Sequence, residues 1–180
     1  MPRTDDSEAL SRLYGTLGRM VWLWSNSELH KTWPVGLQAR FALPAAMTGQ
    51  HCILEREGVP RAYCSWAFLT AEAETRMVLN PNALRPEDWT AGDRLWFIDW
   101  IAPFDARDTR ALRGHMAHRF PRELARSLRV KPGKKTARVA TYAGSGLSRE
   151  EAAALRAMRF RELTEAIERH PDRDKAFRVG

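Results

Sequence analysis

The sequence predicts a single α/β (α+β) domain in which a central mixed sheet is flanked by helices. Three observations carry this prediction: helical and strand patterns alternate along 180 residues, residues 51–69 have the pattern of a β-hairpin, and residues 95–101 form an unbroken apolar run. A chain of this length usually folds as one domain with its own core. We therefore expect one domain over residues 1–180, with loose tails at 1–7 and 171–180.

The N-terminal quarter is expected to be helical. Apolar residues at helical spacing predict a first helix over residues 8–24, and the polar cluster at 25–27 is typical of a helix boundary. Pro34 is suited to open a second helix that continues to about Met47. Thr48 and Gly49 are expected to end it.

Two strands and a helix follow. Residues 51–57 and 59–69 predict a hairpin around Glu57 and Gly58, and residues 71–79 predict a short helix. Cys52 and Cys64 fall on the two arms of the hairpin, where they could face each other as thiols. After a loop at 81–88, the apolar run at 95–101 predicts a central strand covered on both faces.

The C-terminal half is also expected to alternate between helices and strands. Residues 107–128 predict a basic helix that breaks or restarts at Pro121, and residues 138–142 predict a strand. Ser148 and Glu151 have the spacing of a capping box, which predicts the start of a last helix. The tail after Pro171 is polar.

Positive charge is concentrated in one segment. The net charge is +7, and residues 107–138 hold eleven Lys and Arg residues against Asp108 and Glu123. Such a segment expects an acidic partner, either nucleic acid, an anionic membrane or an acidic protein, unless it is only a solvated face. Only Phe120 is aromatic among these basic residues, which disfavours a nucleic-acid reader that stacks bases.

The sequence shows no signal peptide and no apolar run long enough to span a membrane, so we expect a cytoplasmic protein. His115 and His118 have a spacing that can bind metal, but no third ligand follows, and we expect no metal site. The Walker, nucleophile-elbow and Gly-x-Gly-x-x-Gly motifs are absent, so no tightly bound cofactor is expected.

Asp99 and His30 are the residues best suited to chemistry. Asp99 lies in the middle of an apolar strand, where a carboxylate needs an arginine, a histidine or backbone donors as partners. His30 lies in an irregular segment where substrate could reach it, and its imidazole can accept a proton near neutral pH. If the two meet, Asp99 would orient His30 as a general base; otherwise each has an ordinary packing role.

Two tryptophan-rich segments resemble the RTX-toxin-activating protein acyltransferases, the hemolysin-activating C-protein family. The resemblance lies between residues 20 and 142, and the most specific string is Ile98-Asp-Trp-Ile-Ala-Pro-Phe104. The other matching strings are Trp22-Leu-Trp24, Ser27, Leu29-His30, Trp33-Pro-Val35, Ala62-Tyr-Cys-Ser-Trp66, Gly92-Asp-Arg94, Trp96, Phe120-Pro121 and Ser127-Leu-Arg-Val130.

The resemblance implies a GNAT-like fold and transfer of a fatty acyl group from acyl-acyl carrier protein to internal lysine ε-amines of an RTX protoxin. The family's essential histidine and aspartate fall on His30 and Asp99, and an implicated serine falls on Ser27. Homodimerisation is also implied. Phe41 stands where the family usually has Asn, which puts the polar contribution of that position in question.

The chemistry of the residues fits these implications. An amine that attacks a thioester must lose a proton, which His30 could accept, while Ser27 and backbone N–H groups could stabilise the oxyanion. Acyl carrier proteins are acidic, so the basic segment offers Arg113, Arg126 and Arg129 as docking residues. Trp33 and Trp100 are candidates to contact the substrate.

The alternatives are a GNAT enzyme that uses acyl-coenzyme A on another amine, or a catalytically inactive toxin-binding adaptor. A pyrophosphate-binding loop would favour the first, but Arg129-Val-Lys-Pro-Gly-Lys134 does not have that pattern. An intact His30 and Asp99 argue against the second.

Overall fold

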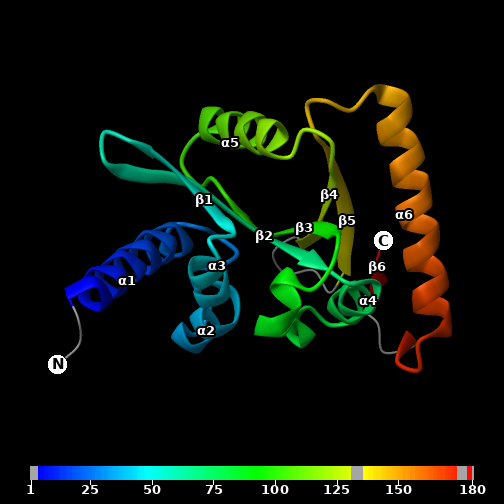
Figure 1. The fold of residues 1–180 in the computed structure, drawn as a ribbon, viewed down its shortest axis with the longest axis horizontal. Coiled ribbons are helices and arrows are strands. Elements are labelled where there is room, and N and C mark those ends of the chain that lie inside the picture. The colour runs from blue at the N-terminus through cyan, green and yellow to red at the C-terminus, as the bar shows by residue number, and fades with distance from the viewer. Residues whose placement is uncertain (1–3, 131–135, 174–177, 180) are drawn as a thin grey trace. The chain divides into compact units, whose positions relative to one another are not determined.

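The computed structural model describes residues 4–130, 136–173 and 178–179 (Figure 1). Contacts divide the chain into two compact units. Unit 1 comprises Met1–Ser65 and Asp99–Leu112, and unit 2 comprises Trp66–Ile98 and Arg113–Gly180. The prediction of a single domain over residues 1–180 stays a prediction.

The described residues form helices and strands in mixed order. The helices are α1 (Thr4–Ser25), α2 (Gln38–Phe41), α3 (Leu43–Thr48), α4 (Ala71–Leu79), α5 (Ala106–Arg119) and α6 (Arg149–Arg169), with 3-10 turns η1 (Val35–Leu37), η2 (Pro81–Ala83) and η3 (Pro86–Thr90). The strands are β1 (His51–Arg56), β2 (Val59–Leu69), β3 (Arg94–Ile101), β4 (Leu124–Val130), β5 (Thr136–Ala143) and β6 (Arg178–Val179).

The strands follow the order of the chain in the sheet, from β1 to β6. β1 pairs with β2 and β4 pairs with β5 in antiparallel fashion, whereas β3 pairs with β4 and β5 pairs with β6 in parallel. A mixed sheet with helices confirms the predicted α+β fold class, and it is consistent with a GNAT-like fold.

In unit 1, α1 begins at Thr4 rather than at residue 8, so part of the expected N-terminal tail is helical. The polar cluster at the end of α1 binds carbonyls of its last turn: Ser25 Oγ donates to Val21 O at 2.9 Å, and Asn26 Nδ2 donates to Trp22 O at 2.8 Å. The cluster therefore ends the helix in the way that its polarity indicated.

The second predicted helix is wrong in one respect, because it is not continuous. It consists of η1, α2 and α3, and Pro44 lies in the first turn of α3. Proline has no N–H to donate and its ring clashes with the carbonyl four residues earlier in a continuous helix, so α2 does not run through it. Gly49 ends α3 with a left-handed φ of 70°, as the sequence indicated.

The hairpin is confirmed. Glu57 and Gly58 connect β1 to β2 with φ values of 54° and 75°, the left-handed pair that a tight two-residue turn requires. The register pairs Cys52 with Cys64, so the two cysteines lie opposite each other, and the structure shows no disulfide between them.

In unit 2, α4 is confirmed at residues 71–79, and Thr70 Oγ1 accepts the N–H of Ala73 at its start. The predicted basic helix over 107–128 is correct only to Arg119. Residues 124–130 form β4, because they pair along their length with β5. In the expected C-terminal tail, β6 pairs with the beginning of β5.

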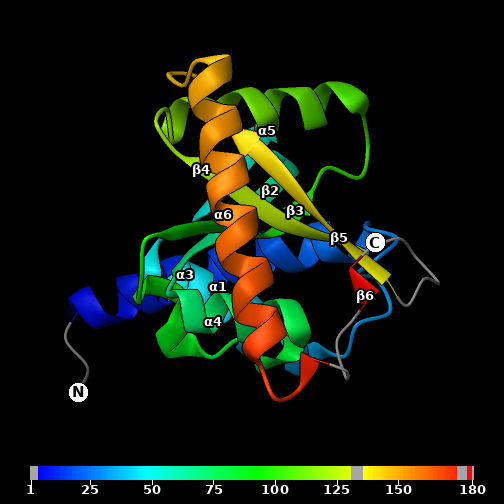
Figure 2. The ribbon, with the colours of Figure 1, turned by 90° about the vertical axis from the view of Figure 1, so that its right-hand side faces the viewer.

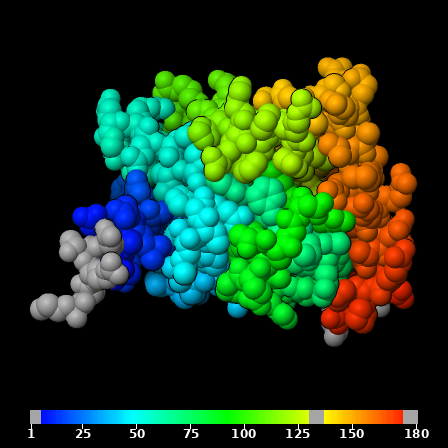
Figure 3. Space-filling model, in the orientation of Figure 1, coloured from blue at the N-terminus to red at the C-terminus, as the bar shows by residue number. Residues whose placement is uncertain are grey.

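The capping box at α6 is also confirmed, since Ser148 Oγ accepts the N–H of Glu151 and the Glu151 carboxylate accepts the N–H of Ser148. Within unit 2, α6 runs along β4 and contacts α4 (Figure 2). Figure 3 shows the side chains of α6 as a continuous orange-to-red surface. In the part of the chain that the structure describes, no helix is long and apolar enough to cross a membrane.

Candidate active site

Ser27 and His30 lie in one turn just after α1, in unit 1. Backbone N–H groups of His30 and Lys31 donate to Ser27 O at 3.0 and 2.9 Å, and Trp33 N–H donates to His30 O at 2.8 Å. The turn brings Ser27 Oγ to 2.7 Å from His30 Nδ1. A residue spacing of three in a helix-like turn is what places the hydroxyl and the imidazole on the same side.

Asp99 reaches the other nitrogen of the same imidazole. His30 Nε2 lies 3.3 Å from Asp99 Oδ1, across 69 positions of sequence. An ionised carboxylate only accepts hydrogen bonds, so its contact with Nε2 assigns the hydrogen to Nε2. Nδ1 is then the acceptor, and Ser27 donates its hydroxyl proton to it. The three side chains therefore form a directed chain, from Ser27 through His30 to Asp99.

Solvent exposure decreases from Ser27 through His30 to Asp99. Ser27 is half-buried, whereas His30 is 6% and Asp99 4% exposed. Contrary to the expectation of an open histidine, the imidazole is buried and both nitrogens have partners; its access to substrate stays a prediction. Ser27 is the member of the chain nearest to solvent.

Aromatic rings enclose the imidazole. Trp24 stacks on His30 with ring centroids 5.6 Å apart and an interplanar angle of 28°, and the Trp33 centroid lies 4.5 Å away. Phe41, 7% exposed, packs on Trp33 at 5.6 Å. Phe41 therefore contributes an apolar ring to the set that holds His30, where the resemblance implies an amide.

Strand β2 also contributes to the site, through Ser65. Ser65 Oγ accepts the backbone N–H of Asp99 at 3.1 Å, which fixes the main chain at this carboxylate. Burial raises the pKa of the Tyr63 hydroxyl and of the Cys64 thiol, and the negative charge of Asp99 raises both further. Both groups therefore stay neutral and add no second negative charge beside Asp99.

The arginines predicted to dock a carrier protein lie in unit 2 and divide into two kinds. Arg113 on α5 and Arg129 on β4 are exposed. Arg126 is 1% exposed and pairs with the buried carboxylate of Glu74, so the prediction that it binds a partner protein is wrong. A docking residue needs a solvent-facing charge, and that of Arg126 is used inside the fold.

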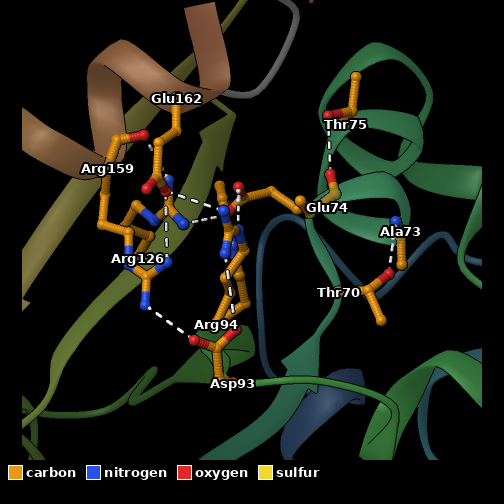
Figure 4. A network of polar contacts seen from close by, with 11 residues as sticks. Thr70, Ala73, Glu74, Thr75, Asp93, Arg94, Arg126, Arg159 and Glu162 are labelled. Atoms are coloured by element: carbon orange, nitrogen blue, oxygen red, sulfur yellow. Dashed lines mark hydrogen bonds and ion pairs between the residues drawn. The ribbon is translucent and has the colours of Figure 1, made fainter. Parts of the chain in front are cut away.

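Arg126 belongs to a buried network that joins α4, β3, β4 and α6 (Figure 4). Glu74 accepts from Trp96 Nε1 at 2.6 Å and from Arg94 Nε at 3.1 Å, and Arg94 reaches Glu162 at 2.8 Å. Burial raises the pKa of Glu74, although the guanidinium groups of Arg126 and Arg94 oppose that rise. The network links these four elements of unit 2 through buried charged groups.

Two further predictions concern Trp100 and metal. Trp100 follows Asp99 on β3, and successive strand residues point to opposite faces, so the two side chains do not share a face. Its contact with substrate stays a prediction. Within residues 4–130, 136–173 and 178–179, no group of three or more His, Cys, Asp and Glu side chains is placed to hold a metal ion.

The sequence profile of the RTX toxin acyltransferase family matches residues 11–143, a range that includes Ser27, His30 and Asp99. The chain belongs to the RTX toxin acyltransferase family. Membership of this family makes the protein an acyltransferase.

Named relatives agree with this assignment. The chain is 47% identical to the protein-lysine palmitoyltransferase CyaC of Bordetella bronchiseptica over 154 residues, which is 86% of this chain and 82% of the relative. It is 42% identical to the protein-lysine myristoyltransferase HlyC of Escherichia coli over 156 residues, 87% of this chain and 91% of the relative. It is also 47% identical to the RTX-II toxin-activating lysine-acyltransferase ApxIIC of Actinobacillus pleuropneumoniae over 122 residues, 68% and 75% of the two chains.

In this acyltransferase, sequence reasoning paired His30 with Asp99 and placed Ser27 beside them, and the structure brings all three together. It did not find Trp24 and Ser65, which bind Asp99 directly. Trp24 gave no separate signal, because a tryptophan at helical spacing is ordinarily part of a core.

Proposed function

We propose that this acyltransferase transfers a fatty acyl group from acyl-acyl carrier protein to internal lysine ε-amines of an RTX protoxin. The observation that carries the proposal is the chain of contacts from Ser27 through His30 to Asp99. A hydroxyl, an imidazole and a carboxylate in this order are the parts of a general-base site. Relatives named as protein-lysine acyltransferases and as an RTX-II toxin activator support lysine as the acceptor and a toxin as the substrate.

In the proposed step, the neutral lysine amine attacks the carbonyl carbon of the acyl thioester. As the C–N bond forms, the nitrogen loses a proton to Ser27 Oγ while the proton of Ser27 passes to His30 Nδ1. Asp99 stabilises the resulting imidazolium through Nε2. The tetrahedral intermediate then expels the carrier thiolate, which takes a proton from Ser27 Oγ while His30 Nδ1 returns its proton to Ser27, and an amide remains.

Ser27 acts as a relay in this scheme because its hydroxyl occupies Nδ1, the only acceptor of the imidazole in this tautomer. It replaces the role of oxyanion donor that the sequence suggested, since its single proton is directed at His30. The same 2.7 Å contact would also serve a serine nucleophile, which would form an acyl-serine intermediate.

The step needs no tightly bound cofactor, because the donor supplies the activated thioester and His30 supplies the base. Acyl carrier proteins are acidic, so the exposed Arg113 and Arg129 remain candidates for binding the donor. Homodimerisation and a cytoplasmic location stay predictions from the sequence.

The experiment is intact-mass spectrometry of a lysine-containing RTX protoxin fragment after incubation with the enzyme and acyl-acyl carrier protein. We expect a gain of one acyl mass that resists hydroxylamine, as an amide does, and no gain with His30→Ala. Parallel reactions with acyl-coenzyme A test the alternative donor. A gain with acyl-coenzyme A alone would overturn the proposed donor, and full transfer by His30→Ala would overturn the proposed base.

A second reaction without toxin separates the two routes through Ser27. Direct transfer predicts that the enzyme itself gains no mass when it is incubated with acyl-acyl carrier protein. A hydroxylamine-sensitive acyl mass on the enzyme, absent in Ser27→Ala, would replace the relay with an acyl-serine.

A further inference from the structure

Trp24, in the last turn of α1, contacts both members of the His30–Asp99 pair. Its indole Nε1 donates to Asp99 Oδ2 at 3.2 Å, and its ring stacks on the imidazole of His30 with centroids 5.6 Å apart. The side chain is 4% exposed. An indole nitrogen is only a donor, so the direction of this hydrogen bond does not depend on a choice of tautomer.

The hydrogen bond from Trp24 occupies one of the two oxygens of the Asp99 carboxylate. Asp99 Oδ2 is held by the indole, and Asp99 Oδ1 is left to face His30 Nε2. The backbone N–H of Asp99 is held separately by Ser65 Oγ. With both its main chain and its second oxygen fixed, the carboxylate cannot rotate away from the imidazole without breaking a hydrogen bond to a charged group.

The stacking contact with Trp24 constrains the imidazole of His30. The Trp24 ring lies nearly parallel to the imidazole, at an interplanar angle of 28°, and Trp33 meets Trp24 edge-on at 80° with centroids 5.3 Å apart. This arrangement limits rotation of the imidazole about its χ2 angle. It also places an aromatic face against the ring that becomes cationic when Nδ1 accepts a proton, and such a face attracts a cation.

We propose that Trp24 is a positioning residue of the acyl-transfer reaction. It aligns Asp99 Oδ1 with His30 Nε2 and holds the imidazole in the plane in which Nδ1 meets Ser27. It acts through these two residues and does not contact the substrate. This inference rests on the proposed function, in which His30 is the base and Asp99 orients it.

The test compares Trp24→Phe with Trp22→Phe. Trp24→Phe keeps an aromatic ring against His30 and removes the N–H donor, whereas Trp22 lies two residues away on α1 and is 49% exposed. Transfer to the protoxin fragment is measured at varied acyl-carrier and protoxin concentrations. We expect kcat to fall roughly 10- to 100-fold in Trp24→Phe, the rate equivalent of one hydrogen bond to a charged group, with KM unchanged. Trp22→Phe should leave both constants unchanged.

A double variant asks whether Trp24 acts through Asp99. If it does, Trp24→Phe combined with Asp99→Asn should be no slower than Asp99→Asn alone. Losses that multiply in the double variant would overturn the inference, as would a wild-type kcat in Trp24→Phe. Full activity in His30→Ala or Asp99→Asn would instead overturn the proposed function, so the two failures are distinguishable.

A spectroscopic measurement covers the case in which Trp24→Phe does not fold. The indole N–H signal of Trp24 in a ¹H–¹⁵N spectrum should shift when Asp99 is changed to Asn, because the acceptor loses its charge. The indole signal of Trp22 is the internal control and should not move. An unchanged Trp24 signal in folded Asp99→Asn would overturn the inference.

Discussion

His30 Nε2 lies 3.3 Å from Asp99 Oδ1, and this contact commits one nitrogen of the imidazole to the carboxylate. The other nitrogen, Nδ1, is 2.7 Å from Ser27 Oγ. In the proposed mechanism, an imidazole whose two nitrogens are both occupied receives its proton through one of its partners. Ser27 is the more exposed of the two partners, so the proposal has the substrate meet the site at Ser27.

Asp99→Asn tests the carboxylate. An amide can donate to Nε2 and would favour the wrong tautomer of His30, so transfer should fall roughly 10²- to 10⁴-fold. The rate of acyl transfer is the measurement, with the melting temperature measured beside it because Asp99 is also held by Trp24 and Ser65. Asp93→Asn, the same change at an exposed side chain, should retain activity. An unchanged rate in folded Asp99→Asn would remove Asp99 from the mechanism.

Ser27→Ala tests the relay. Removing the hydroxyl opens Nδ1 to water, so we expect kcat to fall roughly 10- to 100-fold, less than in His30→Ala. Ser25→Ala is the matched control, because the Ser25 hydroxyl binds only the Val21 carbonyl among the contacts the structure gives it. A loss in Ser27→Ala as large as that in His30→Ala would contradict the relay and favour a serine nucleophile.

Arg113→Glu tests the exposed basic face of α5. Reversing a charge that attracts an acidic carrier should raise the KM for acyl-acyl carrier protein about tenfold at low salt, with less effect at high salt. Steady-state kinetics at two ionic strengths is the measurement. Arg12→Glu, at an exposed position of α1, controls for net charge. Equal effects of the two reversals would mean that overall charge, rather than this face, attracts the carrier.

Arg126→Met tests the buried network. Removing one of the two arginine partners of the buried Glu74 carboxylate should lower the free energy of unfolding by about 3–5 kcal/mol. Urea denaturation measures this change. Arg12→Met breaks an ion pair whose arginine is 72% exposed and should cost less than about 1 kcal/mol. The double variant Glu74→Gln/Arg126→Met should recover part of the loss, and equal losses for Arg12→Met and Arg126→Met would refute the assignment.

The lowered pKa of Asp105 predicts a pH-dependent contribution to stability. Hydrogen bonds from Arg107 lower the pKa of Asp105 from 3.8 to about 2, so the ionised form is favoured in the folded state. The stability from this contact is fully present above pH 3.8 and is lost as the pH falls towards 2. Carboxyl ¹³C titration should show a midpoint near 2, and Arg107→Gln should return it towards 3.8. A midpoint that Arg107→Gln does not move would contradict the cause.

The sequence predicted the parts of the fold that depend on local patterns. Glu57 and Gly58 marked the hairpin, and Ser148 and Glu151 marked the start of α6. It missed β4 because Arg126 appeared to belong to a basic helix, whereas this arginine is buried and pairs with Glu74, 52 positions away. A charged residue in a core can be understood only with its distant partner in place.

In the candidate site, too, local patterns could be read from the sequence and distant contacts could not. An aspartate in an apolar strand required a partner, and the lone histidine in an irregular segment was a reasonable one. The contact of Trp24 with Asp99 spans 75 positions, and no periodic pattern in the sequence predicts it. The contact of Ser27 with His30 is local, but its direction became clear only when Asp99 occupied the other nitrogen.

The turn that joins Ser27 to His30 closes over three residues, whereas the contact of His30 with Asp99 closes a loop of 69 positions. Closing the longer loop costs more conformational entropy than closing the turn. A partly folded chain can therefore contain the serine–histidine pair without the carboxylate. During refolding, helical signal should return before enzymatic activity does.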